Sequence, residues 1–420
     1  MLMLAFAVLF GQGMRKLGQP AVLGEMIGGI VLGPTIFGAL LPSVYVGLFQ
    51  ASGGTGGARD AFIKLGMLFF LFIAGLEIDL GDLRRIGRKA ALIGVIGTLL
   101  PILIGVGLVY ALPMSFWGEA AAVHRFAFAL FIGMNLANSA NPVIARILMD
   151  LGLLKSEIGT LIMTATIFDD LINWTLFAIV LHEIALTAGG SASGNFGISI
   201  VLVLAFFAAV LLGGRWLAPR ARMWLRQHVT FPTGFIAVTA LLILLVGSIA
   251  EALGINAFLG AFLVGAAFGR GRASSPDETG DQAGSYDEAY RAIRHFVLSF
   301  FAPIYFVSMG LNANFITNFD IVLVLVILVV ACASKIGAVL LGARLAGMPI
   351  DRKTLAIGFG LNARGATGII LAGVGLEHGV IDERIFVAMV VMALVTSLLS
   401  APVIKRLMFK AEVQLSEPLS

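Results

Sequence analysis

The stretch TATIFDDLINW, residues 164–174, places two adjacent carboxylates, Asp169 and Asp170, inside an apolar run over residues 157–182. An apolar helix of roughly 17–25 residues is long enough to cross the hydrocarbon core of a bilayer. Ionisable side chains at that depth are costly, and they persist where they pair, line water or carry an ion. The stretch therefore predicts a membrane-spanning helix that contributes to a buried polar site.

The rest of the chain has the same apolar character. Of its 420 residues, 59% are hydrophobic and 12% are charged, and the mean hydropathy is +1.00. Soluble domains average about 25% charged residues, so this composition excludes an ordinary soluble protein. We expect one all-α polytopic membrane domain over residues 1–420, without a soluble domain and with about 13 transmembrane helices, near 1–13, 20–41, 61–77, 90–112, 125–149, 157–182, 197–217, 232–248, 254–268, 295–311, 319–343, 354–377 and 384–409.

The basic residues are distributed unevenly between the connections. Most of the 28 Lys and Arg residues fall in the odd-numbered connections and in the C-terminal tail. Lys and Arg accumulate on the cytoplasmic side of membrane proteins. The bias predicts a multi-pass protein of the cell inner membrane, with its N-terminus outside and its C-terminus in the cytoplasm.

Asp169, Asp170 and Lys335 are the ionisable residues expected deepest in the membrane. Neighbouring positions on a helix point about 100° apart, so the two carboxylates should have different roles. Asp170 shares a helix face with Thr166 and Asn173, which suits a hydrated cation path. Asp169 needs a partner, and Lys335 is the lysine at comparable depth. The alternative is that these charges form salt bridges that only fix helix packing.

Two segments contain residues that interrupt a helix. The first is FIGMNLANSANPVIARIL, residues 131–148, where a proline removes a backbone donor beside polar side chains. The second is IGFGLNARGATGIILAG, residues 357–373, where five glycines surround a polar pair. Paired interrupted helices in the two halves of a transporter mark a site near the membrane midplane. The residues expected at the breaks are Asn138, Ser139, Asn141, Pro142, Asn362 and Arg364.

The chain resembles the bacterial monovalent cation:proton antiporters of the second family, most closely the NapA-type sodium/proton antiporters. The resemblance runs essentially from end to end and includes LGQPAVLGEMIGGIVLGP (17–34), FFLFIAGLEIDL (69–80), IFDDL (167–171), SFFAPIYFVSMGL (299–311) and GLNARGATGII (360–370). The double Asp combined with an intramembrane Lys is its most specific feature. One departure is Ala366, which stands where relatives often carry Glu.

The resemblance implies a NapA-like fold of inverted repeats with two discontinuous crossing helices, assembled as a homodimer. It implies a dimerisation part over about 1–60 and 197–270, and a mobile ion-translocating core over about 61–182 and 295–409 that moves like an elevator. Asp170 would hold the transported metal cation or a proton, and Asp169 would pair with Lys335. The cation and proton site would comprise Asp170, Asp169, Ser139, Asn138, Asn141 and Thr166.

The function expected from these features is electrogenic exchange of a monovalent cation for protons, of the kind used in pH homeostasis. Na⁺ is the first candidate, with Li⁺ and K⁺ open. We expect no enzyme activity, no cofactor and no nucleic-acid partner; the partners expected are the cation, protons, membrane lipid and a second copy of the chain. The main alternative is a sodium-coupled organic-solute symporter of similar fold. An intramembrane aspartyl protease would need its two carboxylates on different helices, and a channel would not need two interrupted helices.

Overall fold

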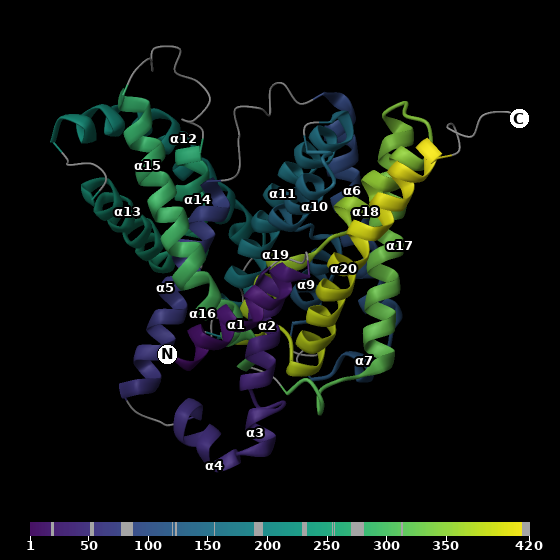
Figure 1. Cartoon of the computed structure of the whole chain (residues 1–420), viewed down its shortest axis with the longest axis horizontal. Coiled ribbons are helices and arrows are strands. Elements are labelled where there is room, and N and C mark those ends of the chain that lie inside the picture. Colours follow the sequence, from purple (N-terminus) through teal and green to yellow (C-terminus); the bar gives the residue numbers. More distant parts are fainter. Residues whose placement is uncertain are drawn as a thin grey trace, which may run out of the picture. The chain divides into compact units, whose positions relative to one another are not determined.

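The computed structural model describes residues 1–420 except 18–20, 51–53, 77–86, 120, 122–123, 155, 189–195, 229–232, 254, 256, 270–280, 312–313 and 414–420. Within the described ranges every regular element is a helix (Figure 1). This agrees with the all-α prediction. It is also what a bilayer requires, because a helix satisfies its backbone hydrogen bonds internally where no water is available.

Each of the predicted apolar segments contains at least one helix. The helices are α1 (Leu2–Lys16), α2 (Ala21–Leu32), α3 (Phe37–Leu40), α4 (Pro42–Tyr45), η1 (Val46–Gln50), α5 (Gly54–Leu76), α6 (Arg88–Ala111), α7 (Met114–Trp117), α9 (Arg125–Ala137), α10 (Asn141–Asp150), α11 (Glu157–Ala188), α12 (Phe196–His228), α13 (Thr233–Ala252), α14 (Ala257–Gly269), α15 (Asp281–Phe296), η3 (Val297–Phe301), α16 (Ala302–Leu311), α17 (Ile321–Leu345), α18 (Arg352–Leu361), α19 (Gly365–Glu377) and α20 (Glu383–Val413).

Among the described residues, six stretches are long and apolar enough to cross a membrane: Ala21–Leu40, Arg88–Ala111, Glu157–His182, Tyr290–Leu311, Ile321–Leu345 and Glu383–Met408. The described residues also contain five shorter apolar helical stretches. Two of these, Arg125–Ala137 and Thr367–Glu377, belong to the two interrupted segments. The full arrangement of 13 transmembrane helices stays a prediction. Two of the predicted segments, 232–248 and 254–268, are separate helices, α13 and α14, that pack against each other.

Aspartates begin three of the helices. Asp320, Asp351 and Asp382 precede α17, α18 and α20, and each carboxylate accepts a backbone N–H of the first turn at 2.9 Å. Such caps satisfy donors that have no partner inside the helix. These three carboxylates therefore define the N-terminal ends of α17, α18 and α20.

The residue contacts divide the chain into two units. One comprises Met1–Phe10, Glu25–Arg85 and Leu181–Leu311, and the other Gly11–Gly24, Ile86–Val180 and Asn312–Ser420. Contacts therefore group α5, α15 and α16 with α12–α14, whereas the expected division assigns 61–77 and 295–311 to the translocating core. The division into a dimerisation part and a core concerns function, and it stays a prediction.

In the first unit, α5 and α14 pack with almost no space between their backbones. A Cβ atom at Gly75 would overlap the carbonyl group of Phe262, and one at Gly265 would overlap that of Phe72. Small residues let two membrane helices approach in this way, so that dispersion forces act over a long interface. Phe72, Ile73, Ala261 and Val264 belong to the apolar cluster at this contact.

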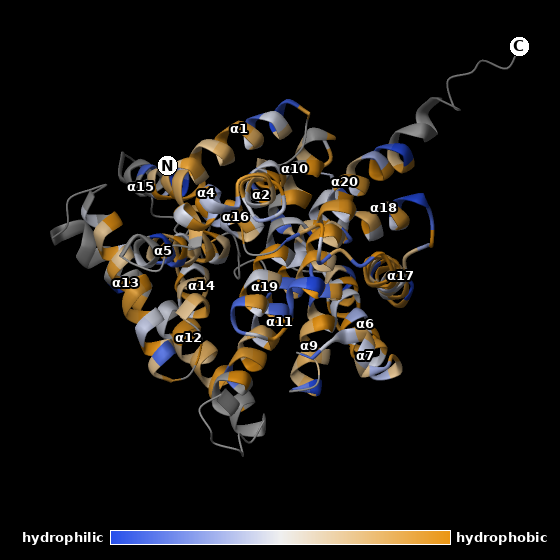
Figure 2. Ribbon diagram, turned by 90° about the horizontal axis from the view of Figure 1, so that it is seen from below, coloured by the Kyte–Doolittle hydropathy of each residue, from blue (hydrophilic) through white to orange (hydrophobic). Residues whose placement is uncertain are grey.

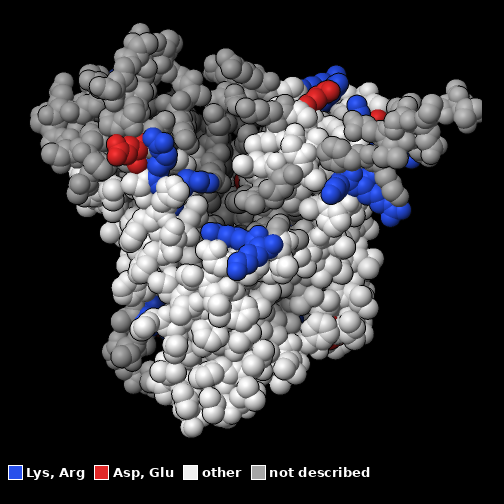
Figure 3. All heavy atoms as spheres, viewed as in Figure 1, with Lys and Arg blue, Asp and Glu red and all other residues white. Residues whose placement is uncertain are grey.

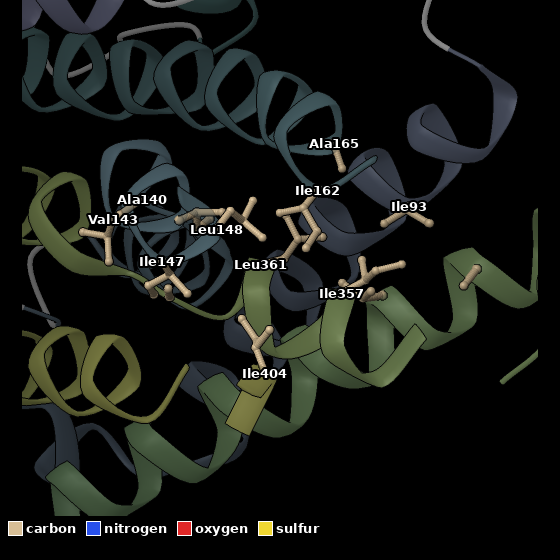
Figure 4. Close-up of a cluster of buried hydrophobic side chains, with 14 residues drawn as sticks. Ile93, Ala140, Val143, Ile147, Leu148, Ile162, Ala165, Ile357, Leu361 and Ile404 are labelled. Atoms are coloured by element: carbon tan, nitrogen blue, oxygen red, sulfur yellow. The ribbon is translucent and has the colours of Figure 1, made fainter. Parts of the chain in front are cut away.

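In the second unit, α6 packs against both α9 and α17. Gly105 of α6 and Gly133 of α9 face each other where the two helices come closest. An apolar cluster that includes Val143, Ile162, Ile357 and Ile404 joins α10, α11, α18 and α20 (Figure 4). Both interrupted segments are thus packed against continuous helices: α6 and α17 contact α9, and α20 contacts α10, α18 and α19.

The outer surfaces of the helices are apolar. Figure 2 shows hydrophobic colouring along most helices, and on the face seen in Figure 3 most of the described atoms belong to neither acidic nor basic residues. Leu103 of α6, Val329 of α17 and Leu241 of α13 are each more than 60% exposed. Exposed apolar surface on this scale is typical of contact with lipid.

Candidate functional site

The two interrupted segments cross in the second unit. Helix α9 ends at Ala137 and α10 begins at Asn141, while α18 ends at Leu361 and α19 begins at Gly365. At the crossing, the backbone N–H of Ala140 donates to the carbonyl of Ala363 at 2.8 Å. The hydroxyl of Ser139 donates to the carbonyl of Leu361 at 2.6 Å. The structure thus contains two interrupted helices at the segments where the sequence predicts them, with their breaks joined by hydrogen bonds.

The residues at the breaks explain why the helices stop. Pro142 lies in the first turn of α10, where its missing N–H removes no intrahelical bond. Gly365 has a φ of +41°, a conformation that other residues adopt only with strain. Its N–H donates to the hydroxyl oxygen of Ser397 on α20 at 3.0 Å, which anchors the start of α19.

Asp169 and Lys335 form a buried ion pair. The Nζ atom of Lys335 lies 3.1 Å from each carboxylate oxygen of Asp169, and the two side chains are 1% and 2% exposed. Lys335 also donates to the carbonyl of Ala137, the last residue of α9. A cation at a helix C-terminus is favoured by the helix dipole. The structure thus brings together the partners that the sequence pairs.

Asp170 lies on α11, and its carboxylate contacts the N-terminal end of α10. The residue is 7% exposed, and the amide of Asn141, the first residue of α10, donates to its Oδ2 atom. The N-terminal end of a helix stabilises negative charge. Asp169 and Asp170 therefore occupy different surroundings, as the 100° rotation between them predicts.

The predicted polar stripe beside Asp170 is only partly present. Asn173 donates to Oδ1 of Asp169 at 3.3 Å, one helical turn away, instead of serving Asp170. Thr166 is buried, and its hydroxyl donates to the carbonyl of Met163 in its own helix at 2.7 Å. The cation path along the face that Asp170 shares with Thr166 and Asn173 stays a prediction.

The asparagines at the first break keep unused hydrogen-bonding groups. Asn138 is 1% exposed, and within the described residues neither its amide nitrogen nor its oxygen has a hydrogen-bond partner. The amide oxygen of Asn141 is likewise buried and unpartnered in that part of the chain. Buried polar atoms of this kind usually bind water or an ion. Ser139, in contrast, uses its hydroxyl to join the two breaks.

Arg364 is fully buried and joins the C-terminal ends of α9 and α18 to the neighbouring helix α17. Its guanidinium donates to the carbonyl and side-chain oxygens of Asn362 at 3.1 and 2.6 Å, to the carbonyl of Leu136, and to the carbonyl of Ala331 at 2.9 Å. The guanidinium of Arg364 thus donates to backbone and amide oxygens alone among the described residues. Asn362 in turn donates to the sulfur of Cys332 at 3.3 Å.

The charges of the site match the ends of the broken helices. Lys335 and Arg364 lie at the negative C-terminal ends of α9 and α18, and Asp170 lies at the positive N-terminal end of α10. No cluster of three or more His, Cys, Asp or Glu side chains occurs among the described residues. The arrangement is suited to one small cation or proton at a single carboxylate supplemented by neutral oxygens.

Thr98 is the residue of this site that the sequence did not indicate. It lies on α6, is fully buried, and its hydroxyl oxygen is 2.6 Å from Oδ1 of Asp169. Its position as a lone hydroxyl midway along an apolar segment was an available signal. That signal could not show which neighbouring helix the hydroxyl meets.

The fold and site define a multi-pass membrane protein with a charged centre where two broken helices cross. The sequence pattern of the family described as "Sodium/hydrogen exchanger, transmembrane" matches residues 2–410. The chain belongs to this family.

Curated relatives include the "Cation/H(+) antiporter 18" of Arabidopsis thaliana, 34% identical over 403 residues, which cover 93% of this chain and 46% of that protein. The chain thus spans about half the length of the plant relatives it matches. The "Na(+)/H(+) antiporter NhaS4" of Synechocystis is 30% identical over 407 residues, with 96% of this chain and 95% of that protein covered. Among solved structures, the sodium proton antiporter MjNhaP1 from Methanocaldococcus jannaschii has the same fold, with a TM-score of 0.67 at 16% identity over 99% of this chain and 96% of that one.

Proposed function

We propose that this protein exchanges a monovalent cation for protons across the membrane, with Asp170 as the group that binds either one. The observation that carries the proposal is the position of Asp170 at the N-terminus of the broken helix α10, beside the buried Asp169–Lys335 pair. A structural salt bridge accounts for Asp169 and leaves Asp170 unexplained. The names of the relatives, which are antiporters, support the same reaction.

The mechanism rests on competition for one carboxylate. A proton and a cation cannot both bind Asp170 favourably, and moving an uncompensated carboxylate through the membrane interior is costly. Only the protonated or cation-bound form would therefore reorient between the two sides. Exchange follows, and the two gradients set its direction.

The neutral ligands of the cation would come from the breaks. The unpartnered amide oxygens of Asn138 and Asn141 are hard oxygen donors of the kind that alkali cations prefer. The hydroxyls of Ser139 and Thr166 donate to backbone carbonyls, but each oxygen keeps acceptor capacity for a cation. Na⁺ is the first candidate, and Li⁺ and K⁺ are tested with it.

The finer features are part of the same proposal. The Asp169–Lys335 pair would exchange a second proton, which makes transport electrogenic as in NapA-type antiporters. The chain would form a homodimer in the inner membrane, with its N-terminus outside and its C-terminus in the cytoplasm, and its core would move like an elevator. No observation in the structure favours the solute symporter, and the relatives reported above are named as antiporters.

The proposal is tested by proton flux in proteoliposomes with an imposed pH gradient. Na⁺, Li⁺ and K⁺ are added in turn to wild-type protein and to Asp170→Asn, which preserves the size of the side chain. Cation-dependent release of the proton gradient in the wild type and its loss in Asp170→Asn are expected. Exchange at normal rates in the variant, or no response of folded wild-type protein to any cation, would exclude the proposed mechanism.

A further inference from the structure

Thr98 makes the shortest hydrogen bond that Asp169 receives. Its Oγ1 atom lies 2.6 Å from Oδ1 of Asp169 and 2.7 Å from the carbonyl oxygen of Gly94, four residues earlier in α6. A hydroxyl has one hydrogen, so it donates to one of these two oxygens at a time. Hydrogen bonds to an ionised group are stronger than neutral ones. While Asp169 is a carboxylate, the hydroxyl therefore donates to Asp169.

The packing of α6 against α11 makes this contact possible. At Gly94, one turn before Thr98, an added Cβ would lie 2.7 Å from the carbonyl oxygen of Ala165 and 3.0 Å from the Cβ of Phe168. Only a glycine allows α6 to approach α11 this closely. The close approach brings the hydroxyl of Thr98 within reach of Asp169 in a fully buried environment.

Donors from three helices surround one carboxylate. Oδ1 of Asp169 receives Lys335 from α17 at 3.1 Å, Thr98 from α6, and the amide of Asn173 from α11 itself at 3.3 Å. Oδ2 receives Lys335, also at 3.1 Å. Thr98 and Asn173 thus donate to the same Asp169 oxygen that Lys335 contacts. Together these bonds fix the plane of the carboxylate in front of the ammonium group.

We propose that Thr98 is a positioning residue for ion exchange: its hydroxyl holds the Asp169 carboxylate in front of Lys335 and away from the cation at Asp170. This inference rests on the proposed function. When Asp169 is neutralised by a proton during the cycle, the hydroxyl can turn to the carbonyl of Gly94, so Thr98 has a partner in both protonation states of Asp169. Because Thr98 contacts Asp169 and not the cation, it sets the rate of exchange without contributing to cation affinity.

The test compares three variants in proteoliposomes at several cation concentrations. Thr98→Val removes the hydroxyl and keeps the shape, and we expect its maximal rate to fall about tenfold, the effect of one hydrogen bond to a charged group, with little change in apparent KM. Thr98→Ser restores the hydroxyl and should recover the rate. Thr175→Val is the matched control, because within the described part of the chain the Thr175 hydroxyl bonds the carbonyl of Leu171 in its own helix, at 2.7 Å, and no other group.

Different results would overturn the positioning role of Thr98 and the proposed cation–proton exchange. Wild-type exchange with an unaffected Thr98→Val, or a Thr98→Val defect that appears only in KM, would overturn the positioning role. If the wild type exchanges no cation, thermal unfolding still tests the contact through Thr98→Val, Lys335→Met and the double variant. The two losses of stability should then be non-additive, because both act on Asp169, and simple additivity would overturn the inference.

Discussion

Lys335 and Asp169 are both almost fully buried, and each neutralises the other across 3.1 Å. Removing one partner of such a pair leaves an uncompensated charge in a low-dielectric interior. We predict that Lys335→Met destabilises the protein by about 3–5 kcal/mol, the typical cost of breaking a buried pair. Thermal unfolding in detergent measures this loss.

The matched control for this prediction is the double variant Asp169→Asn with Lys335→Met, which removes both charges. It should unfold at a higher temperature than Lys335→Met alone, because no buried charge is left without a partner. A double variant less stable than the single one would show that the pair does not neutralise itself in the folded protein.

The sequence identified the charged residues of the site but not all their neighbours. Asp169, Asp170 and Lys335 are conspicuous because charges are rare in apolar segments, and helix geometry separates the roles of the two carboxylates. The partner of Thr98 could not be predicted, because an isolated hydroxyl in a membrane helix can always bond its own backbone. The hydrogen bond of Asn173 to Asp169 could not be chosen from the sequence, since spacings of three and four residues both lie on one helix face.

At the scale of single elements, the start of α18 depends on Asp351. Its carboxylate accepts the backbone N–H of Thr354 at 2.9 Å and the Thr354 hydroxyl at 3.1 Å. The N–H of Thr354 is the main reason why the pKa of Asp351 lies below its ordinary value. We predict that Asp351→Ala costs about 1 kcal/mol of stability, the usual effect of losing a helix cap.

The Asp351 cap should also make the stability of the protein depend on pH. Because the pKa of Asp351 is lowered in the folded protein, its stabilisation is complete above the pKa of the unfolded chain and is lost as the pH falls through the lowered value. Asp351→Asn keeps a capping oxygen without titrating in this range. The stability difference between wild type and Asp351→Asn should therefore shrink between about pH 5 and about pH 3; a difference that grows on acidification would contradict this account of the cap.

The close contact of α5 with α14 leads to a prediction about the stability of the protein. A side chain at Gly75 has no room, because the carbonyl group of Phe262 occupies the position of its Cβ. We predict that Gly75→Val separates the two helices and lowers the unfolding temperature, whereas Gly57→Val, in the same helix with no described atom within 4 Å of its Cβ position, does not. Equal effects of the two substitutions would show that the close approach is not needed for stability.

The elements themselves were largely predictable from hydropathy, and their breaks from Pro142 and the glycines around Arg364. The reason is that lipid leaves the backbone few alternatives to a helix. How the breaks cross was not available from composition, since it depends on the hydrogen bonds of Ser139 and Ala140 with the second break. The grouping of α5 with α12–α16 likewise follows from packing at glycines such as Gly75, whose partners the sequence does not identify.

At the scale of the molecule, every residue of the candidate site belongs to one contact unit. Thr98, Asp169, Asp170, Lys335 and Arg364 all lie within Ile86–Val180 and Asn312–Ser420. A unit that contains the whole site can move without changing the distances within it. This is the property that an elevator mechanism requires of its mobile part, and it supports that part of the proposal.

Competition between cation and proton at Asp170 is tested by the cation dependence of exchange at a series of pH values. Initial rates are measured in proteoliposomes with the cation and the varied pH on the same side of the membrane. We expect the apparent KM for the cation to rise about tenfold per unit of acidification once Asp170 is mainly protonated, while the maximal rate is preserved. An apparent KM that stays constant while the maximal rate falls would contradict competition at a single carboxylate.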